Sequence, residues 1–164
     1  MAIADLTQKE QDALVKLSEI FSFQKPFSEV MGIKPESLET VYAVGHLYYE
    51  QGKYDQALQI FQLLSVLDSD NLKFWKAYAG ALQMVDRLTD AITAYSFCVY
   101  LDATDPEVPF HAGKCYLALG DLAKAQMAFQ GAAYFAKMNP KKYANLEKQA
   151  DLYIKAILEK GGKA

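Results

Sequence analysis

The sequence predicts an all-α protein, a short right-handed solenoid of three helical hairpins between an N-terminal helix and a C-terminal capping helix. Three observations predict it: a 34-residue period, helix-capping residues that recur with that period, and an amphipathic segment after the last repeat. A period of this length with apolar residues at fixed offsets is typical of a helix-turn-helix repeat. Because one such unit cannot bury its own aromatic rings, stability should come from the stacking of neighbouring repeats.

The 34-residue period is visible in sets of matching residues between Leu38 and Asn139, and the spacing within each set never slips by a position. The sets are Gly45, Ala79 and Gly113; Tyr48, Leu82 and Tyr116; Gly52, Asp86 and Gly120; Ala57, Ala91 and Ala125; Phe61, Tyr95 and Phe129. The small residues let paired helices approach closely, and the rings fill the space between repeats. With Trp75 four residues before Ala79, the pattern is that of a tetratricopeptide repeat.

We expect one domain over residues 1–164, divided by the period. An N-terminal helix and connector occupy 1–37, the repeats occupy 38–71, 72–105 and 106–139, and the capping helix occupies 140–160. Within the repeats, the spacing predicts first helices over 38–51, 72–85 and 106–119. It predicts second helices over 54–67, 88–101 and 122–137.

Helix starts should recur with the same period. Ser37, Asn71, Asp105 and Asn139 lie 34 residues apart, and all are residue types whose side chains accept hydrogen bonds from a first helical turn. The fourth cap should open the last helix. That helix carries one apolar stripe, formed by Tyr143, Leu146, Ala150, Tyr153 and Ile157. A helix with one apolar face and one polar, solvent-exposed face suits the terminal cap of a solenoid.

The N-terminal segment begins with a capping box, in which Thr7 caps the helix and Glu10 reaches back to it. Apolar residues follow at helical spacing: Leu14, Leu17 and Ile20. A connector then carries Phe27, Val30, Met31 and Ile33 before Pro35. Such an apolar segment either folds under the first repeat or pairs with another copy, so a homodimer through this segment is one expectation.

Composition gives no indication of nucleic-acid binding. The net charge is −3 and no basic stripe interleaved with aromatic residues is present. The longest largely apolar stretch, 91–101, is too short to span a bilayer, so we expect no direct membrane insertion. With no secretory signal at the start, the expected location is the cytoplasm. Cys98 and Cys115 are expected to be buried as small hydrophobic residues.

The first helices of the repeats should line the concave face of the solenoid. The residues expected there as a peptide-binding groove are Tyr42, His46, Tyr49, Lys76, Gln83, Phe110, Lys114 and Leu117. An aromatic-lined groove suits an extended, proline-containing apolar peptide. The backbone of such a peptide could form hydrogen bonds with the tyrosine hydroxyls, the Gln83 amide and the lysines. Lys76 and Lys114 are expected as isolated cations. The alternative is that the tyrosines merely cover the inner surface without a ligand.

We expect no catalytic residue, metal site or cofactor. His46 should face the groove, whereas His111 should sit among structural contacts near the start of its helix. Neither histidine has a second histidine or a cysteine at metal-ligand spacing, and neither has a serine or cysteine partner that the sequence would nominate as a nucleophile. No glycine-rich phosphate-binding loop is present.

Over most of its length the chain resembles the class II chaperones of bacterial type III secretion, which guard hydrophobic translocator proteins. Three repeats between two terminal helices carry the resemblance, together with two local stretches. One runs from Leu38 to Leu67 and includes Gln-Gly-Lys-Tyr-Asp-Gln-Ala. The other, Asp105 to Cys115, includes the more specific Pro109-Phe110-His111. Tetratricopeptide proteins that clamp the acidic C-terminal tails of heat-shock chaperones have Lys and Asn where Tyr42 and His46 stand, so we do not expect this chain to capture a terminal carboxylate.

The resemblance implies a bacterial cytoplasmic chaperone that keeps translocators soluble before export. It implies binding of a Pro-x-Leu-x-x-Pro-like segment in the concave groove, with aromatic contributions at Tyr42 and Tyr49; His46 stands where the family often has an aromatic residue. Some members also act with a transcriptional activator, which the resemblance makes a second expected partner. The competing hypothesis is a tetratricopeptide scaffold or adaptor of another protein-assembly complex.

Overall fold

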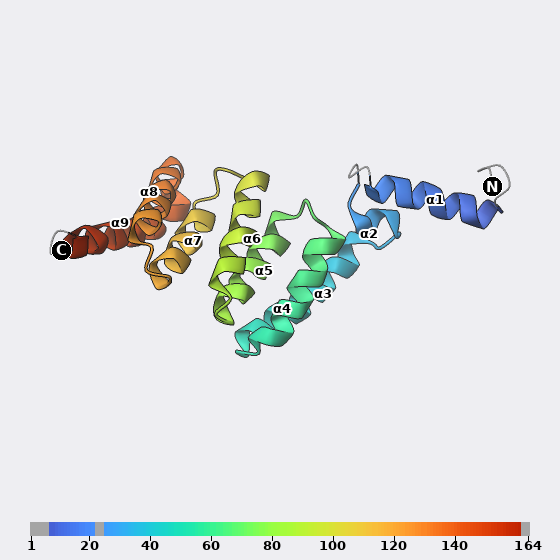
Figure 1. Cartoon of the computed structure of the whole chain (residues 1–164), viewed down its shortest axis with the longest axis horizontal. Helices are drawn as coiled ribbons and strands as arrows, with labels where there is room; N and C mark the ends of the chain where they lie inside the picture. Colours follow the sequence, from blue (N-terminus) through green and yellow to red (C-terminus); the bar gives the residue numbers. More distant parts are fainter. Residues whose placement is uncertain (1–6, 22–24, 162–164) are drawn as a thin grey trace.

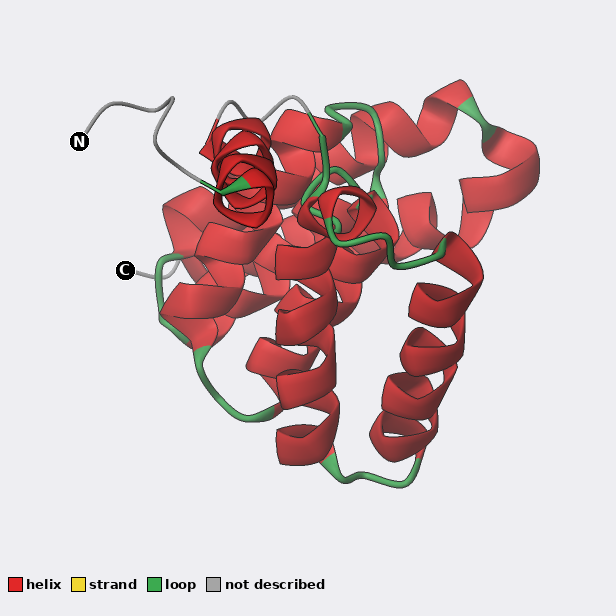
Figure 2. Cartoon of the chain, turned by 90° about the vertical axis from the view of Figure 1, so that its right-hand side faces the viewer, coloured by secondary structure: helices red, strands yellow, loops and turns green. Residues whose placement is uncertain are grey.

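The computed structural model describes residues 7–21 and 25–161, which form helices and loops without a strand (Figure 2). The helices are α1 (Gln8–Phe21), α2 (Phe27–Val30), α3 (Pro35–Glu50), α4 (Tyr54–Leu67), α5 (Leu72–Met84), α6 (Leu88–Leu101), α7 (Glu107–Ala118), α8 (Leu122–Met138) and α9 (Pro140–Gly161). The hairpins α3–α4, α5–α6 and α7–α8 follow one another along the long axis, with α1 and α9 at opposite ends (Figure 1). The predicted all-α solenoid is confirmed, and each repeat helix begins and ends within three residues of its predicted bounds.

Close approach of the two helices in a hairpin depends on the small residues of the repeat. A Cβ atom added to Gly45 in α3 would lie 2.7 Å from a ring carbon of Phe61 in α4. A Cβ atom on Gly113 in α7 would lie 2.9 Å from the ring of Phe129 in α8. Ala79, which holds the same position in α5, has no exposed surface. Backbone and ring are therefore in contact at this position, as the period predicted.

The three intra-hairpin turns share one backbone geometry. Gly52, Asp86 and Gly120 have φ of 73°, 61° and 79°, the left-handed region that favours glycine. In the first turn the N–H of Lys53 donates to the carbonyl of Tyr48 at 2.9 Å, and that of Gly52 donates to Tyr49 at 3.0 Å. These two bonds satisfy carbonyls at the end of α3 and turn the chain into α4.

The predicted N-caps are only partly correct. Helix α3 begins at Pro35, because proline is suited to the first helical position, and Ser37 therefore lies inside the first turn. At α7 the N-cap position belongs to Pro106, but Asp105 beside it still satisfies a donor of the first turn, since its Oδ1 accepts a hydrogen bond from the N–H of Glu107 at 2.9 Å. Asn71 precedes α5, but its side-chain amide donates to Asp68 Oδ2 at 3.1 Å and makes no cap bond.

The N-terminal segment is helical where a connector was expected. Phe27–Val30 forms the short helix α2, in which Val30 is buried, and Ile33 packs against the core of the first two repeats. Helix α1 packs against α2 and extends away from the repeats (Figure 1). It exposes Leu14 (43%) and Leu17 (47%). The side chains of Glu10 and Ile20 lie outside what the structure describes.

The C-terminal helix α9 packs against α8 and ends the core. Ala150 and Ile157 on its apolar stripe are buried, and Tyr153 packs against Phe129. The predicted capping role of this helix therefore has a direct structural basis. None of the helices in the described ranges is both long and apolar enough to cross a membrane.

Candidate functional site

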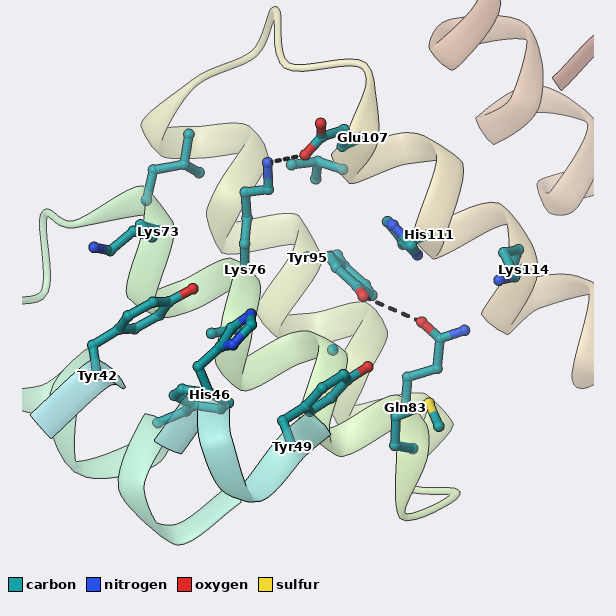
Figure 3. A pocket seen from close by; sticks show the side chains of 16 residues that line it. Tyr42, His46, Tyr49, Lys73, Lys76, Gln83, Tyr95, Glu107, His111 and Lys114 are labelled. Atoms are coloured by element: carbon teal, nitrogen blue, oxygen red, sulfur yellow. Dashed lines mark hydrogen bonds and ion pairs between the residues drawn. The ribbon is translucent and has the colours of Figure 1, made fainter. Parts of the chain in front are cut away.

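A cavity of about 520 Å³ lies where the first helices of the three repeats run side by side (Figure 3). Helix α3 contributes Tyr42, His46 and Tyr49 to its wall, and α7 contributes Glu107, Val108, His111 and Lys114. Helix α5 contributes the largest share: Leu72, Lys73, Lys76, Ala77, Gly80, Gln83 and Met84. Phe61 and Tyr95, from the second helices α4 and α6, complete the lining. We refer to this cavity as the groove.

Six of the eight residues predicted for the groove lie on its wall: Tyr42, His46, Tyr49, Lys76, Gln83 and Lys114. Phe110 and Leu117 do not, so their predicted position is corrected. Phe110 is buried against Phe129 and Tyr153, and Leu117 packs on the same cluster.

The correction has a simple geometric cause. The period makes Phe110 equivalent to Tyr42, and Leu117 equivalent to Tyr49. On α3 this stripe faces the next first helix, α5, and so borders the groove. On α7 the same stripe faces α9, because the solenoid ends there (Figure 1). Helix α7 instead offers the groove the adjacent face, which carries Glu107, His111 and Lys114.

His111 was expected among structural contacts, and it makes them: its ring stacks on Tyr95 with 6.0 Å between centroids and 13° between planes, and it meets the Phe110 ring edge-on at 5.6 Å. It also lines the groove, which the sequence did not predict. The sequence signal that could have placed His111 in the groove was the spacing of Glu107, His111 and Lys114, because residues three and four apart share one face of a helix. Burial lowers the pKa of His111, and the charge of nearby Lys114 adds to the effect.

Tyrosine rings form the wall at the α3 end, and they are continuous with the core. The Tyr42 ring lies 5.6 Å from that of Phe61 and 5.7 Å from that of Phe74, and Lys73 Nζ lies 4.2 Å from the Tyr42 centroid. Tyr49 contacts Tyr54 edge-on at 5.2 Å. Burial raises the pKa of Tyr49, so its hydroxyl keeps its proton and can donate to a ligand.

Two ion-pair sets connect neighbouring first helices across the groove. Lys73 of α5 pairs with Glu39 of α3. Lys76 of α5 pairs with Asp105 at 2.7 Å. It also pairs with Glu107 at the start of α7 (Figure 3). Burial lowers the pKa of Lys76, but the hydrogen bonds to both carboxylates outweigh it and raise the pKa overall. Lys76 is thus a paired cation, not the isolated one that was expected.

Gln83 and Lys114 are two further polar residues on the wall. The Tyr95 hydroxyl donates to Gln83 Oε1 at 3.2 Å, which leaves the Gln83 amide N–H₂ for other partners (Figure 3). Lys114 has no ion-pair partner within residues 7–21 and 25–161. The same ranges contain no group of three or more histidine, cysteine or acidic residues that could hold a metal ion.

Comparison with known proteins supports the repeat assignment. The chain matches the tetratricopeptide repeat family over residues 38–71 and 72–105. It is 35% identical over 94 residues to the low calcium response locus protein H of Yersinia pestis. The match covers 57% of this chain and only 56% of that relative.

Two solved structures cover more of the chain. PcrH of Pseudomonas aeruginosa, in complex with the chaperone-binding region of PopD, is 32% identical with a TM-score of 0.77. That match covers 79% of this chain and 97% of PcrH. The Yersinia enterocolitica type III secretion chaperone SycD, in complex with a peptide of the translocator YopD, is 30% identical with a TM-score of 0.75. It covers 79% of this chain and 98% of SycD.

Proposed function

Because this chain belongs to the family of tetratricopeptide-repeat chaperones of type III secretion translocators, we propose that it binds an extended apolar segment of a translocator in the groove. Binding would keep the translocator soluble and competent for export in the bacterial cytoplasm. The relatives PcrH and SycD are bound to segments of PopD and YopD, which supports a client of the same class. The proposed activity is binding of the translocator, without catalysis.

The observation that carries the proposal is the composition of the groove. Rings of Tyr42, Tyr49 and Phe61 border a cavity of about 520 Å³, large enough for several side chains of a peptide. The charges of Lys73 and Lys76 are neutralised within the chain, so the wall favours apolar side chains. Tyrosine hydroxyls and the Gln83 amide can meet the backbone of an extended segment.

Covering an apolar segment requires contact area and no covalent chemistry. Translocators carry exposed apolar surface that promotes aggregation before they reach a membrane. Release would then occur by competition at the export machinery. A transcriptional activator, which the resemblance adds as a partner, would compete for the chain in the same way if it shared this groove.

Gly80 offers a direct test of groove occupancy. A Cβ atom at Gly80 would have one neighbour within 4 Å, the Tyr95 hydroxyl at 3.9 Å, so a side chain there enters the groove without displacing the core. Gly80→Leu should abolish the rescue of a co-expressed translocator from the insoluble fraction. Its melting temperature should not fall, because leucine has the higher helix propensity.

Gly80→Ala is the matched control, since one methyl group leaves most of the groove open. Alanine at Tyr42 would be a poorer test because its ring packs on the core residues Phe61 and Phe74. If Gly80→Leu, folded as judged by its melting curve, still rescued the translocator as well as Gly80→Ala, the groove would not be the client site.

We also propose that the chain self-associates through α1. Leu14, Val15 and Leu17 are 43%, 57% and 47% exposed on a helix that leaves the repeats. Light scattering should give a dimer mass for the natural chain and a monomer mass for Leu14→Glu combined with Leu17→Glu. Lys16→Glu, on the same exposed helix, controls for added negative charge. A monomeric natural chain at micromolar concentration would contradict this part of the proposal.

A further inference from the structure

Lys114 occupies a distinct position on the groove wall. It lies at the end of the groove away from Tyr42 and Lys73, near His111 and Gln83 (Figure 3). Its side chain is half-buried. A peptide that fills the groove would displace water from around this ammonium group, so a negative charge on that peptide would interact with it more strongly than at an exposed site.

The other cations on the wall already have partners. Lys73 pairs with Glu39, and Lys76 pairs with both Asp105 and Glu107. Those pairs link α3 to α5 and α5 to the start of α7, so both lysines already have acidic partners within the chain. No acidic side chain within residues 7–21 and 25–161 is paired with Lys114.

The groups beside Lys114 do not supply a negative charge. Burial lowers the pKa of His111, which leaves a neutral ring at neutral pH. Gln83 is uncharged and accepts a hydrogen bond from Tyr95. Glu107, one turn of α7 before His111, is held by Lys76. Lys114 is thus a cation without an acidic partner at one end of a groove that is lined by aromatic rings and whose other lysines are paired.

We propose that Lys114 binds a side-chain carboxylate of the client, so that the preferred ligand is an apolar segment carrying one aspartate or glutamate at a fixed register. This inference rests on the proposed function. A charge at one end of the groove also gives an extended peptide a preferred direction, because reversing the peptide would remove its carboxylate from the lysine.

The test uses fluorescent, C-terminally amidated peptides of the pattern Pro-x-Leu-x-x-Pro in an alanine and serine background. A single aspartate is moved along the peptide, and each member has an asparagine counterpart. Binding is measured by fluorescence anisotropy at two salt concentrations. At one register the aspartate peptide should bind about tenfold more tightly than its asparagine counterpart, the gain expected from one charge-assisted hydrogen bond.

That gain should vanish in Lys114→Met, which keeps the aliphatic stem, and Lys114→Glu should prefer a lysine peptide at the same register. Lys148→Met, on the exposed face of α9, is the matched control and should keep the gain. A peptide without aspartate but with a free C-terminal carboxylate completes the set. It distinguishes a side-chain carboxylate from a chain terminus.

Equal binding of aspartate and asparagine peptides, or a gain that survives in Lys114→Met, would overturn the inference and leave the proposed function intact. A gain confined to the free C-terminus would also overturn it. Failure of every peptide to bind would overturn both the inference and the groove assignment, since the apolar contacts alone should give measurable affinity.

Discussion

Tyr153 of α9 stacks face to face on Phe129 of α8, with 4.5 Å between ring centroids and 4° between ring planes. Phe110 of α7 meets both rings edge-on, 5.7 Å from Phe129 and 5.9 Å from Tyr153. Phe110 and Phe129 belong to the third hairpin, and Tyr153 lies where a fourth repeat would pack. The cluster therefore closes the solenoid, and it explains why Phe110 belongs to the core and not to the groove.

Tyr153→Ala should destabilise the chain by about 2–4 kcal/mol, because it removes a ring from this cluster and leaves a cavity beside Phe129. Urea unfolding followed by circular dichroism would measure the loss. Tyr100→Ala is a suitable control, since Tyr100 is 81% exposed on α6, and it should cost less than about 1 kcal/mol. Equal losses in the two variants would contradict the capping role of α9.

Gly45→Ala and Gly80→Ala should change stability in opposite directions, although both glycines lie inside first helices. At Gly45 the new methyl group would lie 2.7 Å from Phe61, so overpacking should cost about 1–3 kcal/mol. At Gly80 the methyl group would have only the Tyr95 hydroxyl within 4 Å, at 3.9 Å, and the gain in helix propensity is about 0.5–1 kcal/mol. Thermal unfolding of both variants decides the matter, and a stabilised Gly45→Ala would refute the packing argument.

Asp86 is the one non-glycine residue with positive φ in the described ranges, at the position that Gly52 and Gly120 hold in the other hairpins. Asp86→Gly should therefore stabilise the chain by about 1 kcal/mol, by relieving the cost of a left-handed Cβ. Gly52→Ala, made in parallel, should destabilise it by about the same amount. Denaturant midpoints would test both, and a destabilised Asp86→Gly would show that the aspartate side chain stabilises its turn.

Cys98 and Cys115 should be unreactive in the folded chain. Both are fully buried and free of disulfides, and burial raises the pKa of Cys98 to about 12 and that of Cys115 to about 11. Since the thiolate is the nucleophile, Ellman's reagent at pH 8 should label neither thiol within minutes. Both should react at once in guanidinium chloride. Rapid labelling under native conditions would place one thiol at the surface.

His111 should make stability fall as the pH is lowered. Its pKa is below the ordinary value of 6.5 in the folded chain because burial disfavours the charged ring. Near and below pH 6.5 the unfolded chain then binds more protons than the folded chain, so acidification favours unfolding. The drop in melting temperature between pH 7.5 and pH 5.5 should be smaller in His111→Gln than in the natural chain.

His46→Gln is the control for this pH dependence, because His46 is exposed on α3 and its Nδ1 contacts Glu50 Oε1, at 3.3 Å, on the surface. Its melting temperatures should follow those of the natural chain. An NMR titration that placed the pKa of His111 above 6.5 would contradict the burial argument directly.

Much of the fold could be predicted from the sequence because its signals are local. The 34-residue spacing located every hairpin, and glycines at positions 52 and 120 marked two of the three turns. The start of α3 was missed by three residues, since Pro35 opened the helix before the expected cap at Ser37. The ion pairs of Lys76 could not be predicted, because they depend on the distance between α5 and the start of α7, and the spacing of residues along one helix does not give that distance.

The sequence by itself determined the repeat, the turns and the residues that share one face of each helix, because these depend on neighbours a few positions away. Only the tertiary structure decided which face borders the groove, because that depends on the element packed on each side. Tyr42 has α5 beyond it and borders a cavity, whereas its equivalent Phe110 has α9 beyond it and is buried. Identical positions in a repeat thus acquire different roles because a solenoid has two ends.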